Sequence, residues 1–241
     1  MTSHPDRFTM TDAPSWRIDR EESRARYLAK FDATGAADYH AAVGTLSEGD
    51  EQAYQSDIEA LLPLAPGADV LDAGAGTGSL TSVLTRLPGL MVTALEPSPA
   101  MLAILRGNPR LREVATVEGF CDALEDRRLF QRGRFDAIVS RQLANGLYDP
   151  LGAFANWAHW LKPGGAVLVI EGIYGRDAWT GAWSEEVDVL PLSACQGLAT
   201  VPYLLEAAGF RVEAVGWMDA VNRRPATRTP RYAVLARRVT P

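Results

Sequence analysis

The residues best suited to chemistry in this sequence are three glycines and the aspartate before them. Asp72 ends a short apolar run, and Gly74, Gly76 and Gly78 follow at alternate positions. Without Cβ atoms, the backbone there can pass very close to a ligand. Apolar residues then recur at the spacing of one buried helical face, so the free N–H groups at the start of that helix suit a carboxylate or phosphate. The pattern predicts a strand, a ligand-binding glycine turn and a helix.

A second acidic residue, Glu96, ends the next predicted strand, residues 91–96, and Pro97 follows it. A carboxylate at that position can accept hydrogen bonds from both hydroxyl groups of a ribose. The alternative is a helix-capping or solvated carboxylate, and the glycine turn upstream favours ribose binding. Met101, further along, is either a core residue or an adenine contact. The glycine run is G-x-G-x-G rather than the G-x-G-x-x-G of dinucleotide-binding folds, which disfavours a nicotinamide-dependent oxidoreductase.

A parallel sheet would bring these residues together. Strands and helices alternate from residue 69 onward, which is typical of parallel strands joined by helices. Strands are expected at residues 69–72, 91–96, 114–118, 135–140, 166–171, 211–217 and 232–237. In open sheets of this kind, ligands bind beyond the carboxyl ends of the strands. We therefore expect Asp72 and Glu96 at the same edge of the sheet.

The acid followed by the glycine run resembles motif I of the class I S-adenosylmethionine-dependent methyltransferases. Further along, residues 136–141 read D-x-I-x-S-R, Asp149 and Pro150 follow, and L-K-P-G-G stands at residues 161–165. These segments, in this order, resemble a group of small methyltransferases of that class. The resemblance covers residues 69–171 and is loose for the N-terminal part and the tail.

The resemblance implies a doubly wound, Rossmann-like α/β fold with a seven-stranded, mostly parallel sheet whose last strand is antiparallel. It also implies S-adenosylmethionine as the cofactor. Residues 1–50 are expected to form an N-terminal helical cap or lid. Residues 51–241 would form the cofactor-binding methyltransferase domain, with a substrate-covering insert at about residues 172–192.

The implied cofactor site follows the strand ends. The amino-acid end of the cofactor would lie over the turn at residues 74–78 and its ribose at Glu96. Its adenine would lie near Asp122, for which Glu118 is the alternative. Arg141 would lie near the reactive sulfur or, alternatively, would form a structural ion pair. The expected cofactor-binding residues are Asp72, Ala73, Gly74, Gly76, Glu96, Pro97, Met101, Asp122, Ala123 and Arg141.

Methyl transfer is an in-line displacement at a sulfonium carbon that releases a neutral thioether. Holding the acceptor in line with the methyl group can contribute roughly 7–11 kcal/mol, and an oxygen or protonated amine acceptor must also lose its proton. The sequence offers three candidate bases: Glu171 at the end of a predicted strand, His40 in the cap, and His159 on the preceding helix. Each has a structural alternative, which for Glu171 is a loop carboxylate that accepts backbone hydrogen bonds.

Three aromatic residues of the insert are candidates for contacts with the acceptor. Tyr174, Trp179 and Trp183 lie among glycines, which suits a flexible cover over an apolar or aromatic molecule. The alternative is a loop that the tryptophans pin to the core. Arginines within residues 222–228 could meet an anionic acceptor, although solvated side chains are the favoured interpretation.

Composition narrows the function further. The net charge of −6 argues against a broad nucleic-acid-binding surface. Cys121 and Cys195 form no C-x-x-C pair, and no clustered carboxylates suggest a metal, so we predict no metal ion. No apolar run approaches the roughly 20 residues of a membrane span. Because the N-terminus also lacks a signal-peptide pattern, the expected location is the cytoplasm.

The sequence therefore predicts a methyltransferase that acts on a small molecule, of the type found in specialised metabolism. The alternatives are a methyltransferase of peptide or RNA and a non-catalytic S-adenosylmethionine-binding regulator. Whether oxygen, nitrogen, carbon or sulfur accepts the methyl group stays open. Trp160 is expected to point away from the buried stripe of its helix, toward a second subunit of a homodimer or toward the cap.

Overall fold

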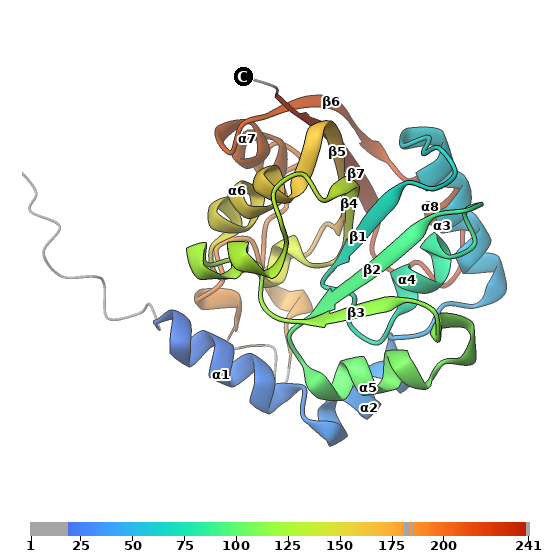
Figure 1. Ribbon diagram of the computed structural model, residues 1–241. Coiled ribbons are helices and arrows are strands. Elements are labelled where there is room, and N and C mark those ends of the chain that lie inside the picture. Colours follow the sequence, from blue (N-terminus) through green and yellow to red (C-terminus); the bar gives the residue numbers. More distant parts are fainter. Residues whose placement is uncertain (1–18, 181–183, 185, 240–241) are drawn as a thin grey trace, which may run out of the picture.

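The computed structural model describes residues 19–180, 184 and 186–239, which fold around one seven-stranded sheet (Figure 1). The strands are β1 (Asp69–Ala73), β2 (Met91–Glu96), β3 (Ala115–Glu118), β4 (Phe135–Arg141), β5 (Leu161–Gly172), β6 (Phe210–Trp217) and β7 (Arg231–Arg238). Their order across the sheet is β3-β2-β1-β4-β5-β7-β6. Strands β1 to β5 pair in parallel, and β7 runs antiparallel to β5 and β6. The predicted mostly parallel, Rossmann-like sheet with an antiparallel last strand is confirmed.

Helices cover both faces of the sheet, with α3, α4 and α8 on one side and α6 and α7 on the other (Figure 1). The helices are α1 (Arg20–Lys30), α2 (Ala33–Ala42), α3 (Glu48–Leu61), α4 (Ser79–Leu84), α5 (Pro99–Gly107), α6 (Pro150–Trp160), α7 (Thr200–Ala207) and α8 (Asp219–Asn222). In β1, Val70 packs in the cluster on the α3 side, whereas Leu71 packs in the cluster on the α6 side. Successive strand residues point to opposite faces, so a strand covered on both faces is apolar throughout.

The strand order reverses at β1, because the chain first builds outward through β2 and β3 and then returns to place β4 on the other side of β1. A crevice beyond the carboxyl ends of the strands at such a switch point is the usual ligand site of open α/β sheets. The residues after β1, β2 and β4 therefore face one another across this crevice.

Helices α1 and α2 lie beside α5 (Figure 1). Phe31, which ends α1, packs with Ala36 of α2 and Met101 of α5 in a small apolar cluster. No residue of α1 itself is buried. Tyr27 of α1 packs against this cluster, with its ring centroid 4.8 Å from that of Phe31, and the polar contacts of α1 are described below.

Trp160 does not point away from the core, so that prediction is wrong. Its side chain is fully buried, at 0% exposure, and its ring centroid lies 5.1 Å from that of Phe130. Its Nε1 donates a hydrogen bond to the carbonyl oxygen of Arg127 at 2.8 Å. The 3-10 helix Leu124–Leu129 and the residues after it cover this side of α6, which the helical periodicity of α6 alone could not indicate.

Two further features bear on function. Cys121 is buried, Cys195 is half-buried, and both are free thiols. Within the described ranges, no helix combines the length and the apolar character needed to cross a bilayer, and no cluster of His, Cys, Asp or Glu side chains could hold a metal ion.

Candidate active site

A cavity of about 860 Å³ opens at the carboxyl ends of β1, β2 and β4. It is lined by the glycine turn, by side chains of α1 and α2, by the loop after β4, by the segment after β5, and by residues before β7. Small-molecule sites usually measure roughly 300–1,000 Å³. The cavity is therefore large enough for a cofactor and a second small ligand.

The glycine turn contributes bare backbone to the cavity. Gly74 and Gly76 line it and have φ angles of +72° and +55°. The N–H groups of Gly74 and Ala75 both donate to the carbonyl oxygen of Leu95 at 2.9 Å, which fixes the turn against β2. A Cβ atom on Gly74 would lie 2.8 Å from Cδ1 of Leu143. Gly74 is therefore required both for its backbone conformation and for the space it leaves.

Glu96 lies directly beside this turn and is only 1% exposed. Its Oε2 accepts a hydrogen bond from the Gly76 N–H at 3.1 Å. Its Oε1 accepts from the Ser98 N–H at 2.9 Å and from the hydroxyl of Tyr27 on α1, also at 2.9 Å. Burial raises the pKa of Glu96 to about 7, and the three hydrogen bonds oppose that shift.

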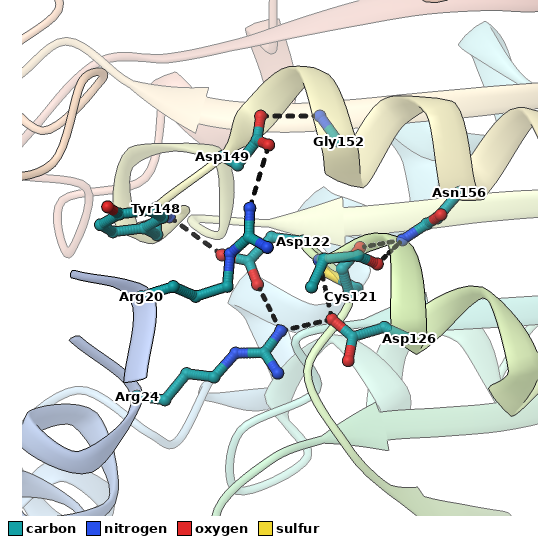
Figure 2. Close-up of polar contacts among 10 residues, drawn as sticks. Arg20, Arg24, Cys121, Asp122, Asp126, Tyr148, Asp149, Gly152 and Asn156 are labelled. Carbon is teal, nitrogen blue, oxygen red and sulfur yellow. Dashed lines mark hydrogen bonds and ion pairs between the residues drawn. The ribbon is translucent and has the colours of Figure 1, made fainter. Parts of the chain in front are cut away.

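Two arginines of α1 reach the loops beside the cavity (Figure 2). Arg24 forms ion pairs with Asp122 at 3.0 Å and with Asp126 at 2.5 Å. Arg20, one helical turn earlier, forms an ion pair with Asp149 at 3.3 Å. These contacts supply the polar attachment that α1 needs, and they occupy the carboxylate predicted to meet adenine.

Arg141 ends β4 and lines the cavity between the glycine turn and α3. Its Nε donates to the hydroxyl of Tyr54 at 3.1 Å, and its Nη1 donates to Oγ of Ser79 at 3.0 Å. Within the described part of the chain it forms no ion pair, so the alternative of a structural ion pair is not observed. A guanidinium held by two neutral hydroxyls retains its full charge for a ligand.

Three predicted cofactor contacts do not line the cavity: Asp72, Ala73 and Ala123. Asp72 is completely buried behind the turn, where its Oδ2 accepts from the Thr81 hydroxyl at 2.6 Å. Burial raises the pKa of Asp72 to about 7. The side chain joins the end of β1 to α4, so it can act on a ligand only through the position of the turn.

Comparison with known proteins agrees with this geometry. The family model described as "Methyltransferase domain" matches residues 71–169. Ubiquinone biosynthesis O-methyltransferase of Xanthomonas campestris pv. campestris (strain B100) is 35% identical over 104 residues, which are 43% of this chain and 43% of that protein. The chain thus spans less than half the length of the curated relatives it matches.

Solved structures share the fold. A SAM-dependent methyltransferase from Aquifex aeolicus has a TM-score of 0.63 at 19% identity, covering 87% of this chain and 100% of that chain. The (4+2)-cyclase SpnF has a TM-score of 0.66 at 16% identity, covering 91% of this chain and 97% of that chain. Residues 71–169 form a methyltransferase domain, and the chain shares its fold with these solved structures. For this part of the chain, the predictions of the methyltransferase family and of S-adenosylmethionine as its cofactor are confirmed.

The residues of this methyltransferase domain fit that cofactor. The glycine turn leaves open space at Gly76, where an added Cβ would have only Met101 Sδ nearby, at 3.9 Å. Glu96 places two carboxylate oxygens at the edge of the same cavity, as a ribose requires. Of the predicted cofactor residues, those that line the cavity are Gly74, Gly76, Glu96, Pro97, Met101, Asp122 and Arg141.

The three candidate bases of the methyltransferase domain and its cap do not line the cavity. His159 lies in the last turn of α6, and its carbonyl oxygen accepts from Gly133 just before β4, so it stands at the opposite edge of the sheet. His40 lies on α2 with Nδ1 buried and without a partner among the described residues. Glu171 is 3% exposed, and its Oε1 accepts from the Ala144 N–H at 2.7 Å. Glu171 lies in β5 rather than in a loop, and it agrees with the structural alternative in accepting a backbone hydrogen bond, whereas its Oε2 is buried without a partner among the described residues.

Replacing Glu171 with glutamine is therefore expected to change stability in a pH-dependent way. Burial raises the pKa of Glu171 from 4.5 to about 7, although Arg231 and backbone N–H groups oppose the shift. The folded state thus favours the neutral carboxyl, and wild-type stability falls as pH rises from about 4.5 to about 7. Glutamine cannot ionise, so the variant should gain up to about 3 kcal/mol over wild type across this window.

Urea unfolding at pH 5 and pH 8 measures that difference, and comparison of the two proteins at each pH cancels the titration of Asp72 and Glu96. A stability difference that is the same at both pH values would contradict the structural role of Glu171.

Two of the three aromatic residues predicted to contact the acceptor line the cavity. Tyr174 and Trp179 line it, with ring centroids 6.3 Å apart, whereas Trp183 lies outside the described residues. Gln142, directly after β4, has a φ of +55°, which is rare for a residue other than glycine. Its Nε2 donates to the hydroxyl of Tyr174 at 2.5 Å. The loop after β4 and the segment after β5 are thereby joined at the cavity.

The predicted site residues did not include several residues that line the cavity, among them Tyr27, Tyr39, Tyr54 and Arg231. In the sequence, Tyr27 and Tyr39 are aromatic residues scattered among polar residues of the expected cap. Tyr54 recurs with apolar residues at helical spacing, which indicates only a packed helix face. Arg231 is the first residue of a strand. The rule that ligands bind beyond the carboxyl ends of strands therefore does not select it. Because β7 is antiparallel to β5, its amino end lies at the same edge of the sheet as the cavity.

Proposed function

We propose that this protein is an S-adenosylmethionine-dependent methyltransferase whose acceptor is a small molecule of specialised metabolism. The observation that carries the proposal is the single cavity with two chemically different ends. Glycine backbone and Glu96 line one end, and Tyr174 and Trp179 line the other. A nucleoside at the first end and an aromatic or apolar acceptor at the second would meet between them.

When bound, S-adenosylmethionine supplies a methyl group on a positively charged sulfur. In our proposal Glu96 accepts hydrogen bonds from the ribose, and Arg141 pairs with the carboxylate of the amino-acid end. Side chains of α1 and α2 and the segment after β5 exclude water, which strengthens the effect of fixed charges. Because the three predicted bases lie outside the cavity, we propose that catalysis rests on positioning, a contribution of roughly 7–11 kcal/mol in favourable cases.

The arginines of α1 do not offer free charge to RNA. Arg20 and Arg24 are the arginines that α1 turns toward the loops beside the cavity, and both are already paired with carboxylates. A polyanion would have to displace these partners. The fold by itself does not decide the chemistry, since one protein of this fold is a cyclase.

Incubation with methyl-labelled S-adenosylmethionine and a metabolite extract of the producing cell tests the proposal. We expect S-adenosylhomocysteine and a labelled small product. Binding of S-adenosylmethionine without S-adenosylhomocysteine formation would favour the regulator, and label in RNA or peptide would favour the other alternative. Thermal stabilisation by NAD alone would overturn the proposal altogether.

A cytoplasmic location also belongs to the proposal, and the two free cysteines support a reducing compartment. The buried position of Trp160 removes the observation that suggested a homodimer, and we do not propose one.

We further propose that α1 acts as a cover held mainly by charge. Replacing Arg24 with alanine should leave Asp122 and Asp126 without their common partner and accelerate amide exchange in residues 20–30 by about tenfold or more. Leu28→Ala is the matched control, because Leu28 lies on the same helix and is 39% exposed. Equal exchange in the two variants would contradict the role of Arg24.

A further inference from the structure

Most charged groups that line the cavity already have a partner of opposite sign. Among the acids, Asp122 pairs with Arg24 at 3.0 Å, and Glu186 pairs with Lys30 at 2.7 Å. Asp50, on α3, pairs with Arg224 at 2.7 Å. Positive charge that is free to bind an anionic ligand must therefore come from arginines that form no ion pair with these acids.

Arg231 is such a residue at the acceptor end. It lines the cavity and forms no ion pair within the described ranges. Its Nη1 donates to the hydroxyl of Tyr174, and its guanidinium carbon lies 5.5 Å from the centroid of that ring. The nearest acid along the sheet, Glu171, is buried, and its Oε1 accepts a hydrogen bond from a backbone N–H. Arg231 is thus held in place by a neutral hydroxyl. Glu171 is near enough for the charge of Arg231 to lower the pKa of its carboxyl, but the two form no ion pair among the described residues.

The fold fixes Arg231 before any ligand arrives. Asn222 accepts from the Arg231 N–H at 2.7 Å and donates to the Arg231 carbonyl oxygen at 2.8 Å. Gly172 is its partner on β5, and a Cβ there would lie only 2.2 Å from the Arg231 Nη1. The guanidinium passes through the space that Gly172 leaves open. A side chain fixed in this way loses little freedom on binding.

Tyr174 completes the arrangement. Its hydroxyl oxygen accepts from both Arg231 and Gln142, so its own hydrogen is available to a ligand. Arg231 uses one of five N–H groups for this bond and can offer others. A guanidinium and a hydroxyl side by side match a carboxylate or phosphate group, which accepts several charge-assisted hydrogen bonds.

Two other arginines line the cavity without an ion pair among the described residues, Arg141 and Arg228. Arg228 is exposed, whereas Arg141 lies nearer the glycine turn and has a different assignment. It donates to Ser79 at the start of α4, where the amino-acid end of the cofactor belongs in the proposed function. Arg231 instead lies beside Tyr174, whose ring neighbours Trp179. Arg141 and Arg231 can therefore serve two different ligands.

We propose that Arg231 and Tyr174 form an oxyanion-binding subsite for the methyl acceptor, which is an aromatic or apolar molecule that carries a carboxylate or phosphate. This inference rests on the proposed function and names the chemical class of its substrate. The aromatic body would lie against Trp179, and the apolar side chains of Val189 and Leu190 also line the cavity.

The test measures binding of three probes to the full chain saturated with S-adenosylhomocysteine: 3-phenylpropanoate, phenyl phosphate and the neutral 3-phenylpropanamide. At least one anion is expected to bind about tenfold or more tightly than the amide, and the tighter of the two identifies the acidic group. Arg231→Gln should abolish the preference. Arg223→Gln is the matched control, because Arg223 is exposed and does not line the cavity, and it should keep the preference.

The outcomes separate this inference from the function on which it rests. If S-adenosylhomocysteine does not bind the wild-type protein, the proposed function fails. If it binds but no anion is preferred over the amide, only the oxyanion subsite fails. A loss of S-adenosylhomocysteine affinity of tenfold or more in Arg231→Gln would assign Arg231 to the cofactor and overturn the inference. Should Arg231→Gln not fold, Tyr174→Phe, which removes only the hydroxyl, is expected to reduce the preference several-fold and decides the question.

Discussion

Replacing Glu96 with glutamine is expected to weaken S-adenosylhomocysteine binding by about 100-fold. Each hydrogen bond to a charged group contributes about 1.5–3 kcal/mol, and about 1.4 kcal/mol corresponds to a factor of ten. Glutamine keeps the shape but replaces one acceptor oxygen by a donor, which would also face the Gly76 N–H. Isothermal titration calorimetry measures the effect. Glu118→Gln is the matched control, because Glu118 pairs in register with Glu96 at the end of β3 but is exposed and does not line the cavity.

The same carboxylate predicts how cofactor affinity depends on pH. Because burial raises the pKa of Glu96 to about 7, a growing share of the free protein carries a neutral carboxyl as the pH falls below 7. The ionised form offers acceptors to both ribose hydroxyls, so the affinity should decline below about pH 7, approaching tenfold per pH unit. The Glu96→Gln protein should show no such decline. A wild-type affinity that is constant from pH 8 to pH 5 would contradict ribose binding by Glu96.

Replacing Trp160 with alanine is expected to destabilise the folded protein by about 3–5 kcal/mol. The side chain is fully buried against Phe130, and its Nε1 satisfies the carbonyl oxygen of Arg127. Truncation would leave a cavity and an unsatisfied carbonyl group. Chemical denaturation of the purified variant measures the loss of unfolding free energy.

Leu151→Ala is the matched control for Trp160, because Leu151 lies on the same helix and is 43% exposed. It should change the free energy of unfolding by less than about 1 kcal/mol. If Trp160→Ala kept wild-type stability but altered the oligomeric state, Trp160 would be an interface residue and its burial in the core would be refuted.

Several features of the candidate site could be predicted from the sequence because they depend on neighbours in the chain. The glycine turn is one of them, since Gly74 and Gly76 adopt positive φ angles at the place where the strand meets the helix. Glu96 is another, since the end of β2 brings it to the cavity edge. In both cases a local signal and the rule for open sheets are sufficient.

The direction of a side chain was harder to predict than its place along a strand. Asp72 ends the predicted first strand, as Glu96 ends the second, yet it points behind the turn to Thr81. His159 lies on the helix that leads into β5, but at its carboxyl end, which is far from the ligand edge in a parallel α/β unit. A shift of one residue in a strand turns the side chain to the opposite face of the sheet, and the two ends of a helix in a parallel α/β unit lie at opposite edges of the sheet.

The cap illustrates a different difficulty. Arg20, Arg24 and Tyr27 lie on one face of α1, and this face meets Asp149, Asp122 and Glu96 of the domain. The buried face of a helix is identified in a sequence by the periodicity of its apolar residues. A helix attached by ion pairs does not show that periodicity. Its partners are carboxylates about seventy or more residues away, and only the folded chain brings them within reach.

The sequence by itself determined the sheet, the glycine turn, the acid beside it and the class of cofactor, because each depends on residues close together in the chain. Only the tertiary structure decided that α1 and Arg231 line the cavity and that Trp160 lies in the core. The physical reason is that an antiparallel β7 returns its amino end to the ligand edge, beside a glycine of β5 that leaves room for a guanidinium. The position of Arg231 depends on the pairing of β5 with β7, and a pattern of neighbouring residues cannot predict it because the two strands are far apart in the sequence.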